Sequence, residues 1–328
     1  MHLTTSDFNL LQNGPAFGEA PTVATAPGKI ILIGEHAVVY GRPAIATPVW
    51  GVKAIATIYN RPSGSGCTFV ASDIGLQFRL KEASDDQPLA LVTRLALHQV
   101  GIEQEPDWQI ELRSELPIAG GLGSGAALSA ALVQAIFAHT HYPIRAEEVS
   151  KIVYESERFY HGTPSGIDNT VIAYGAPLWF VKGEAPRIFH STQSLHLLIA
   201  DSGIPSPTKE TVGDVRRAWN LEPQRYEAWF DEIAEIASGA RQCIESGNVV
   251  ELGKLLDHNH VLLQQLGVSS PTLDRLVDVA HQAGAFGAKL SGGGRGGNVI
   301  ALIDPNHRDL ITHALLNAGV RRVLSTVV

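Results

Sequence analysis

Three polar side chains stand out because they lie among apolar neighbours, where a charge is costly to bury. Lys29, Glu35 and His36 occur within APGKIILIGEHAVVYG, residues 26–41. A buried polar group without a partner costs free energy. A single lysine near the start of a strand is more often a solvated charge. A Gly-Glu-His turn between two apolar runs is harder to explain without a functional site.

A carboxylate with two possible uses follows a Pro-Ser-Gly turn in HGTPSGIDNTV, residues 161–171. Asp168 could cap a helix, for which aspartate is a favoured residue. It could equally be directed into a cleft as a functional carboxylate. Glu157 lies upstream on the preceding predicted helix, where an exposed salt-bridge partner is commoner than a metal ligand. The residues by themselves leave both alternatives open.

A glycine-rich loop in PIAGGLGSGAALSAALVQAI, residues 117–136, could bind an anion. A strand, then glycines, then a helix start would place free N–H groups and the positive helix end at one point, which suits phosphate. No Lys-Ser or Lys-Thr follows, so this is not a Walker A loop. A membrane span needs about 20 predominantly apolar residues, and Pro117 with four glycines occupies the front. A purely structural turn remains the alternative.

A second glycine-rich segment, GAKLSGGGRGGNVIAL, covers residues 287–302. A glycine run costs backbone entropy when it becomes ordered. We therefore expect this segment to approach another loop or a ligand closely. Arg295 interrupts the glycines; it could reach a phosphate or point into solvent, and solvent is the favoured of the two.

The elements that must position these residues are predicted from periodicity. Alternating apolar and polar residues predict half-buried strands at 52–60 and 108–116, and the second runs directly into the first glycine loop. Residues 126–139 predict a buried helix, and 146–161 an amphipathic helix with acidic residues in its first turn. Short apolar runs predict two strands, 23–26 and 29–33, around a Pro27-Gly28 turn.

A change of composition near Pro186 predicts a domain boundary. Beyond it we expect a strand at 195–200, a helix-rich section over 208–267, and a helix at 270–283. A strand, the second glycine segment, a strand at 298–303 and a final helix follow. Periodicity alone therefore predicts a mixture of α and β structure.

Composition narrows the class of protein. The 328 residues carry 25 basic and 33 acidic side chains, a net charge of −8, and no basic run. This argues against a nucleic-acid or membrane partner.

Cys67 and Cys243 occur without a CxxC spacing, and residues 1–20 lack a secretion signal, so we expect a cytoplasmic protein. The histidines of HNH, residues 258–260, are spaced i and i+2 and share no helix face.

All four segments, in their order along the chain, resemble motifs of the GHMP superfamily of small-molecule kinases, and within it of the mevalonate kinases. APGKIILIGEHAVVYGRPAIA is similar to the N-terminal motif, PIAGGLGSGAALS to the ATP loop, YESERFYHGTPSGIDN to the segment with the catalytic aspartate, and KLSGGGRGGNVIAL to the C-terminal glycine motif. DSGIPSPTKETVGDVR and NHVLLQQLGVSS also resemble mevalonate kinases. The likeness extends from Ala26 to about Leu302.

The resemblance implies an α+β, two-domain GHMP kinase fold. Residues 1–186 would form a domain like ribosomal protein S5 domain 2, and residues 187–328 a ferredoxin-like domain, with the active site between them. The implied reaction is phosphorylation of the C5 hydroxyl of mevalonate, with ATP as co-substrate and Mg²⁺ as cofactor. Asp168 would take the hydroxyl proton, and Lys29 would keep Asp168 ionised.

The resemblance also assigns binding residues. Ser124 and Glu157 would be the metal ligands, and the ATP phosphates would lie on one short loop, made of Pro117, Gly120, Gly121, Leu122, Gly123, Ser124, Gly125 and Ala126. The acceptor substrate would contact side chains and glycines from both predicted domains, namely Glu35, His36, Thr208, Gly292 and Gly293.

One departure from the family pattern concerns the metal. The ATP loop usually carries a second serine, often the Mg²⁺ ligand, where this chain has Gly125. Either Ser124 or water would replace it. The alternatives to the implied reaction are phosphorylation of phosphomevalonate, a different mevalonate hydroxyl or a sugar, or a ligand sensor without turnover. A homodimer is left open.

Overall fold

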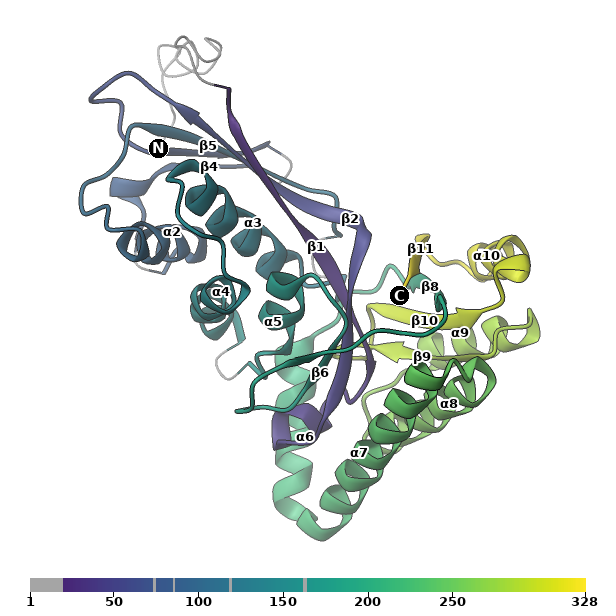
Figure 1. Ribbon diagram of the computed structural model, residues 1–328. Coiled ribbons are helices and arrows are strands. Elements are labelled where there is room, and N and C mark those ends of the chain that lie inside the picture. Colours follow the sequence, from purple (N-terminus) through teal and green to yellow (C-terminus); the bar gives the residue numbers. More distant parts are fainter. Residues whose placement is uncertain (1–19, 73–74, 85, 118–119, 162–163) are drawn as a thin grey trace.

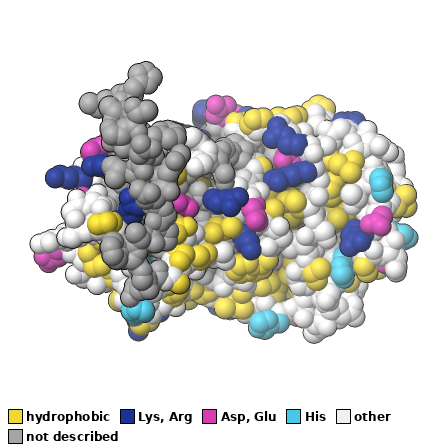
Figure 2. All heavy atoms as spheres, turned by 90° about the horizontal axis from the view of Figure 1, so that it is seen from above, with side chains coloured by type: hydrophobic (Ala, Val, Ile, Leu, Met, Phe, Trp, Pro, Cys, Tyr) yellow, Lys and Arg dark blue, Asp and Glu magenta, His cyan; other side chains and the backbone are white. Residues whose placement is uncertain are grey.

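Two β-sheets with helices packed on them build the molecule, as the computed structural model shows (Figure 1). The structure describes residues 20–72, 75–84, 86–117, 120–161 and 164–328. The predicted mixture of helix and sheet is confirmed. The prediction that residues 1–20 carry no secretion signal concerns a segment that lies, apart from Ala20, outside the described residues. On the face drawn in Figure 2, basic, acidic and hydrophobic side chains lie interspersed.

The larger sheet is mostly antiparallel and is organised around one long strand, β2. Its path runs β4-β3-β5-β2-β6-β7, while β1 pairs with β2 alone. Helix α3 packs on β1 and β2 and contacts α2, α4 and α5 (Figure 1). The strands are β1 Thr22–Ile33, β2 Ala44–Asn60, β3 Thr68–Ala71, β4 Leu76–Arg79, β5 Trp108–Ser114, β6 Leu178–Phe180 and β7 Arg187–Ile188. The helices are η1 Ala37–Tyr40, η3 Leu80–Glu82, α2 Pro88–Gln99, α3 Ser124–His139, α4 Ala146–His161 and α5 Ile167–Tyr174.

The smaller sheet has four antiparallel strands in the order β11-β8-β10-β9. Helices α8 and α9 pack against the edge strand β9. The strands are β8 His196–Asp201, β9 Gly287–Ser291, β10 Asn298–Ile303 and β11 Arg322–Val327. The helices are α6 Thr208–Leu221, α7 Pro223–Ser246, α8 Val249–Gln265, α9 Pro271–Gln282, η4 Pro305–His307 and α10 Arg308–Asn317.

Most predicted elements are present, with one difference at the N-terminal motif. The predicted turn at Pro27-Gly28 does not form; β1 continues through it with a shift of register against β2. Proline cannot donate a ladder hydrogen bond, but a strand can accommodate it at such an irregularity. The two short strands predicted at 23–26 and 29–33 are therefore parts of one strand. β7 ends at Ile188 and β8 begins at His196, and the boundary predicted between residues 186 and 187 stays a prediction.

The two units are held together beside the site-bearing turn that follows β1. Tyr40, at the end of η1, stacks on Phe230 of α7 with ring centroids 4.3 Å apart. Arg42 Nε donates to Asp231 Oδ1 at 3.0 Å on the same helix. Across the described residues, no helix is both long and apolar enough to cross a membrane.

Candidate active site

Lys29 and Asp168, 139 positions apart in the chain, meet in the structure. Lys29 lies on β1 and Asp168 in the first turn of α5, and Lys29 Nζ is 3.1 Å from Asp168 Oδ2. The lysine side chain is 5% exposed and the aspartate 30%, so the carboxylate remains accessible to a ligand. Gly166, with a φ of 91°, occupies the N-cap of α5. Asp168 is therefore not the capping residue, and its direction into a cleft stays a prediction.

Glu157 is buried on α4 beside this pair. Its side chain is not the exposed salt-bridge partner that its sequence position allowed, because the residue is only 5% exposed. The pKa of Glu157 is raised to about 8, first by burial and then by the nearby charge of Asp168, while Lys29 opposes the rise. A cation bound beside Glu157 would favour the ionised form of this carboxyl and so lower its pKa.

The free edge of β1 anchors the first glycine loop. Lys29 N donates to Leu122 O at 3.0 Å. Gly123, with a φ of 74°, is the N-cap of α3, which begins at Ser124. A Cβ at Gly123 would lie 3.1 Å from Lys29 Cγ, so glycine lets the loop lie against the lysine. The loop thus brings the start of α3 next to the Lys29–Asp168 contact.

The remaining predicted loop residues have mainly backbone roles. Leu122 and Ala126 are each 1% exposed, and Gly120 N donates to Pro117 O at 3.3 Å. No side chain among the described residues caps α3. The backbone N–H groups of the first turn, such as those of Ser124 and Gly125, therefore remain available to an anion at the positive end of the helix.

Glu35 and His36 are buried in the turn between β1 and η1. Glu35 forms an ion pair with Lys289 of β9, and both side chains are at most 1% exposed. His36 Nε2 lies 3.1 Å from Gly293 O, and burial lowers the pKa of His36 to about 4. A carbonyl can only accept, so Nε2 carries the proton and Nδ1 is left as an acceptor.

The second glycine segment lies against the first glycine loop and against α6. Gly292 has a φ of 100°, and a Cβ there would lie 3.8 Å from Gly121 O. At Gly293 a Cβ would lie 2.5 Å from Thr208 Oγ1, so only glycine permits this approach. Asn298 Nδ2 donates to Gly120 O across the same contact. The predicted close approach to another loop is therefore present, and it brings Thr208 to the second glycine segment.

Arg295 does not simply point into solvent. Its guanidinium forms an ion pair with Asp214 of α6, and Nε donates to Gly267 O at 3.3 Å. About a third of each side chain in this pair is exposed. The favoured expectation for Arg295 was incomplete, because the acidic partner lies 81 positions away in the chain.

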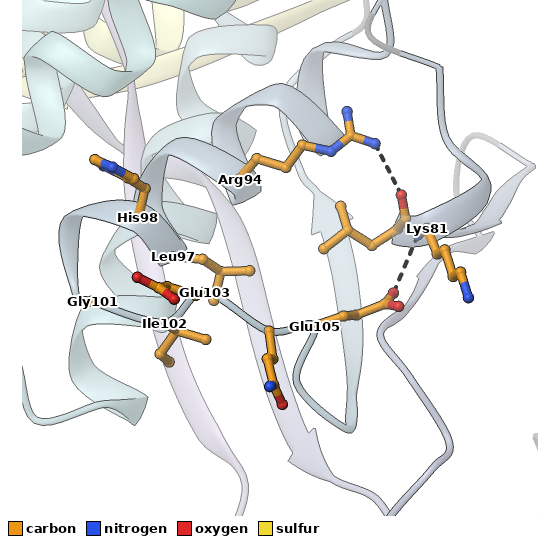
Figure 3. A pocket seen from close by; sticks show the side chains of 10 residues that line it. Lys81, Arg94, Leu97, His98, Gly101, Ile102, Glu103 and Glu105 are labelled. Carbon is orange, nitrogen blue, oxygen red and sulfur yellow. Dashed lines mark hydrogen bonds between the residues drawn. The ribbon is translucent and has the colours of Figure 1, made fainter.

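A separate hollow lies away from these residues, between α2 and η3 (Figure 3). Arg94 Nη2 there donates to Leu80 O at 3.1 Å and Ala83 O at 2.7 Å. Glu105 Oε1 accepts from Lys81 N at 3.2 Å. These groups already bond to the protein, and none of the predicted site residues lines the hollow. We therefore place the site at β1 and the two glycine segments.

Comparison with known proteins identifies the family of this chain. The chain matches the GHMP kinases N terminal domain over residues 74–176 and the GHMP kinases C terminal domain over residues 240–321. It is 31% identical to a mevalonate kinase of Pyrococcus abyssi and 33% identical to one of Thermococcus onnurineus. Each alignment covers 90% of this chain and 93% of the relative. The chain belongs to the mevalonate kinase family.

The structural likeness to mevalonate kinases is equally extensive. The crystal structure of L. major mevalonate kinase in complex with R-mevalonate matches with a TM-score of 0.81 at 26% identity. The match covers 97% of this chain and 98% of that one. The predicted GHMP kinase fold is confirmed, and so is the prediction that the protein is a kinase enzyme with small-molecule substrates.

Sequence reasoning missed three residues that join the parts of the candidate site together. Lys289 pairs with Glu35, Ser291 Oγ bonds both Ile31 N at 3.1 Å and Ile31 O at 2.9 Å, and Asn298 reaches the glycine loop. Lys289 carried a usable signal, because it is a charge between apolar residues of a strand, as Lys29 is. Ser291 and Asn298 carried none, since small polar residues beside glycines are common in loops.

The depressed pKa of His36 predicts a dependence of stability on pH. The unfolded chain binds a proton at His36 more readily than the folded one, so stability falls as pH drops from about 6.5 towards about 4. Between about pH 7.5 and about pH 5, His36 alone should cost about 2 kcal/mol of unfolding free energy. Urea unfolding of the wild type and His36→Gln at both pH values measures this. Equal pH dependence in the two proteins would contradict it.

Proposed function

We propose that the protein transfers the γ-phosphoryl group of ATP to the C5 hydroxyl of mevalonate, giving 5-phosphomevalonate and ADP. One observation carries this proposal: in a chain of the mevalonate kinase family, the accessible carboxylate of Asp168 meets Lys29 beside a glycine-capped helix start. Phosphoryl transfer depends on positioning and charge neutralisation more than on covalent help. This arrangement supplies both.

Asp168 acts as the general base in this proposal. It accepts the proton of the C5 hydroxyl while the hydroxyl oxygen forms a bond to the γ-phosphorus. The bond from that phosphorus to the bridging oxygen breaks, and ADP leaves with the electron pair. Lys29, 3.1 Å from Asp168, orients the carboxylate and stabilises negative charge that develops on the transferred group.

The two glycine segments bind the substrates. The loop from Pro117 to Ala126 and the first turn of α3 hold the ATP phosphates, since uncapped N–H groups at a helix start attract anions. Acceptor binding falls to groups around the second segment, and neutral His36 offers Nδ1 to a hydroxyl donor. The acceptor-binding residues are Glu35, His36, Thr208, Gly292 and Gly293.

The donor set fits a magnesium ion. Mg²⁺ prefers hard oxygen ligands and keeps several waters, and Glu157 is a buried carboxylate whose ionised form a cation would favour. We assign Glu157 and Ser124 as the protein ligands, with water where Gly125 replaces a second serine. The ion would supply charge neutralisation for the triphosphate. No cluster of three or more His, Cys, Asp or Glu side chains occurs among the described residues.

Three broader predictions complete the proposal. We propose that the two domains comprise residues 1–186 and 187–328 and that the chain forms a homodimer. We also propose a cytoplasmic location, with which two buried, unpaired cysteines, Cys67 and Cys243, are compatible.

An acceptor panel tests the proposed reaction. With ATP and Mg²⁺ present, ADP release should require mevalonate and should be at least about 100-fold slower with phosphomevalonate or galactose, whose extra polar groups need different partners. Phosphorus NMR of the product should show the phosphate on the C5 oxygen. Turnover of another acceptor, a phosphate on another hydroxyl, or binding without ADP release would each contradict the proposal.

Replacing the base tests its assignment. Asp168→Asn keeps the shape of the side chain but removes the proton acceptor, so kcat should fall about 100-fold or more. Thermal unfolding should show that the fold survives. The matched control is Asp309→Asn, which alters a carboxylate 78% exposed on α10 and should leave kcat unchanged. A variant Asp168→Asn with wild-type kcat would refute the assignment.

Magnesium titration tests the metal ligand. Glu157→Gln removes the buried anionic ligand, so half-maximal activity should need about tenfold more Mg²⁺. Glu155→Gln is the control on the same helix, because the Glu155 side chain is 42% exposed and pairs with Arg158 at 3.0 Å. If both variants respond to Mg²⁺ as the wild type does, Glu157 is not a ligand.

A further inference from the structure

Lys289 and Glu35 form a buried ion pair that joins the two units of the molecule. Lys289 lies on β9 of the smaller sheet and is 0% exposed, while Glu35 follows β1 of the larger sheet and is 1% exposed. The ammonium contacts Glu35 Oε1 and also donates to Leu290 O at 2.6 Å. Two acceptors therefore fix the direction of the lysine side chain.

The backbone around Lys289 is equally fixed. β9 is an edge strand, and its outward N–H groups at Ala288 and Leu290 donate to side chains of α8. Asp257 Oδ1 accepts from Ala288 N at 2.9 Å, and His260 Nδ1 from Leu290 N at 3.3 Å. These bonds lie on either side of Lys289, so its position relative to α8 has little freedom.

Stability alone does not account for this pair. Taking two charges out of water costs several kcal/mol per ion, and well-packed apolar residues are often as stabilising as a buried ion pair. In addition, no described residue provides a hydrogen-bond partner for Glu35 Oε2, which is itself buried. An acceptor oxygen kept without a protein partner is expensive unless a ligand uses it.

The charges around Glu35 decide its ionisation. Burial raises the pKa of Glu35. The ammonium of Lys289 opposes this rise most strongly, followed by the backbone N–H of Glu35 itself and then by Lys29. Burial in turn lowers the pKa of Lys289, which Glu35 opposes. The titratable and charged groups near the pair are Lys29 on β1, His36 beside Glu35, Arg295 near His36, His260 on α8, and Asp274 on α9 bonded to His260.

We infer that Lys289 is a positioning residue for the acceptor substrate: it engages Glu35 Oε1 and keeps the carboxylate charged, so that Oε2 is left to accept a hydrogen bond from a substrate hydroxyl. The inference rests on the proposed function, because it assumes that the acceptor binds at Glu35. Lys289 does not touch the substrate. Its effect passes through Glu35.

Lys289→Met tests this role. Without the ammonium, Glu35 binds a proton more readily, so kcat/KM for mevalonate should fall about tenfold or more while KM for ATP stays within about twofold. The acid limb of the pH profile of kcat/KM should move to higher pH. Activity relative to the wild type should therefore recover as pH rises. An unmoved acid limb, or an equal rise of both KM values, would overturn the inference.

A double-mutant cycle separates positioning from general damage to the fold. Glu35→Gln already carries a neutral side chain, so adding Lys289→Met to it should change kcat/KM less than about twofold. Additive losses would show that Lys289 acts by another route. If Lys289→Met does not fold, Lys289→Gln replaces it, since its amide can still donate to Leu290 O.

The control variant removes a different cation from the same sheet. Arg322 on β11 forms an ion pair with the buried Asp201, with its Nε 3.7 Å from Asp201 Oδ2. Arg322→Met removes this cation. It should lower thermal stability but leave the acid limb unmoved, and a shift equal to that of Lys289→Met would count against the inference. Wild-type turnover of mevalonate, measured in the same assay, decides the proposed function separately. If the protein phosphorylates another acceptor instead, the ratio of kcat/KM between the variants and the wild type, measured with that acceptor, still tests the role of Lys289.

Discussion

The free edge of β1 is the constraint on which the site depends. β1 pairs with β2 on one side only, and an edge strand must satisfy its remaining backbone groups elsewhere. The N–H of Lys29 donates to Leu122 O of the first glycine loop. The N–H and C=O of Ile31 both bond to Oγ of Ser291, the last residue of β9 in the smaller sheet. One strand edge thus aligns the first glycine loop, the lysine of the ion pair and the second unit.

The same alignment brings opposite charges together in a protein of net negative charge. Asp168, Lys29, Glu35 and Lys289 alternate in sign, and the two ion pairs among them connect elements far apart in the chain. An acidic protein can bind a triphosphate when local N–H groups and a few cations outweigh its average charge. Here both cations are buried or nearly so, and solvent screens the two ion pairs little.

The sequence predicted those parts of the structure that depend on local pattern. The buried helix after the glycine loop and the amphipathic helix that carries Glu157 follow from periodicity, and α4 has the predicted bounds of 146–161. The meeting of Lys29 with Asp168 could not be derived from spacing, since 139 residues separate them; only the family resemblance suggested it. Partners of Arg295 and Lys289 were missed for the same reason, because ion pairs between distant elements leave no periodic signal.

The contact of η1 with α7 limits how the sequence of such a chain can evolve. Tyr40 and Arg42 follow His36 closely, and they are anchored on Phe230 and on Asp231 of the other unit. A second unit borrowed from a relative would have to bring a matching aromatic and acidic surface as well as its glycine motif. The two halves are therefore poor candidates for recombination as independent modules, and substitutions at this junction are expected to accumulate in matched sets.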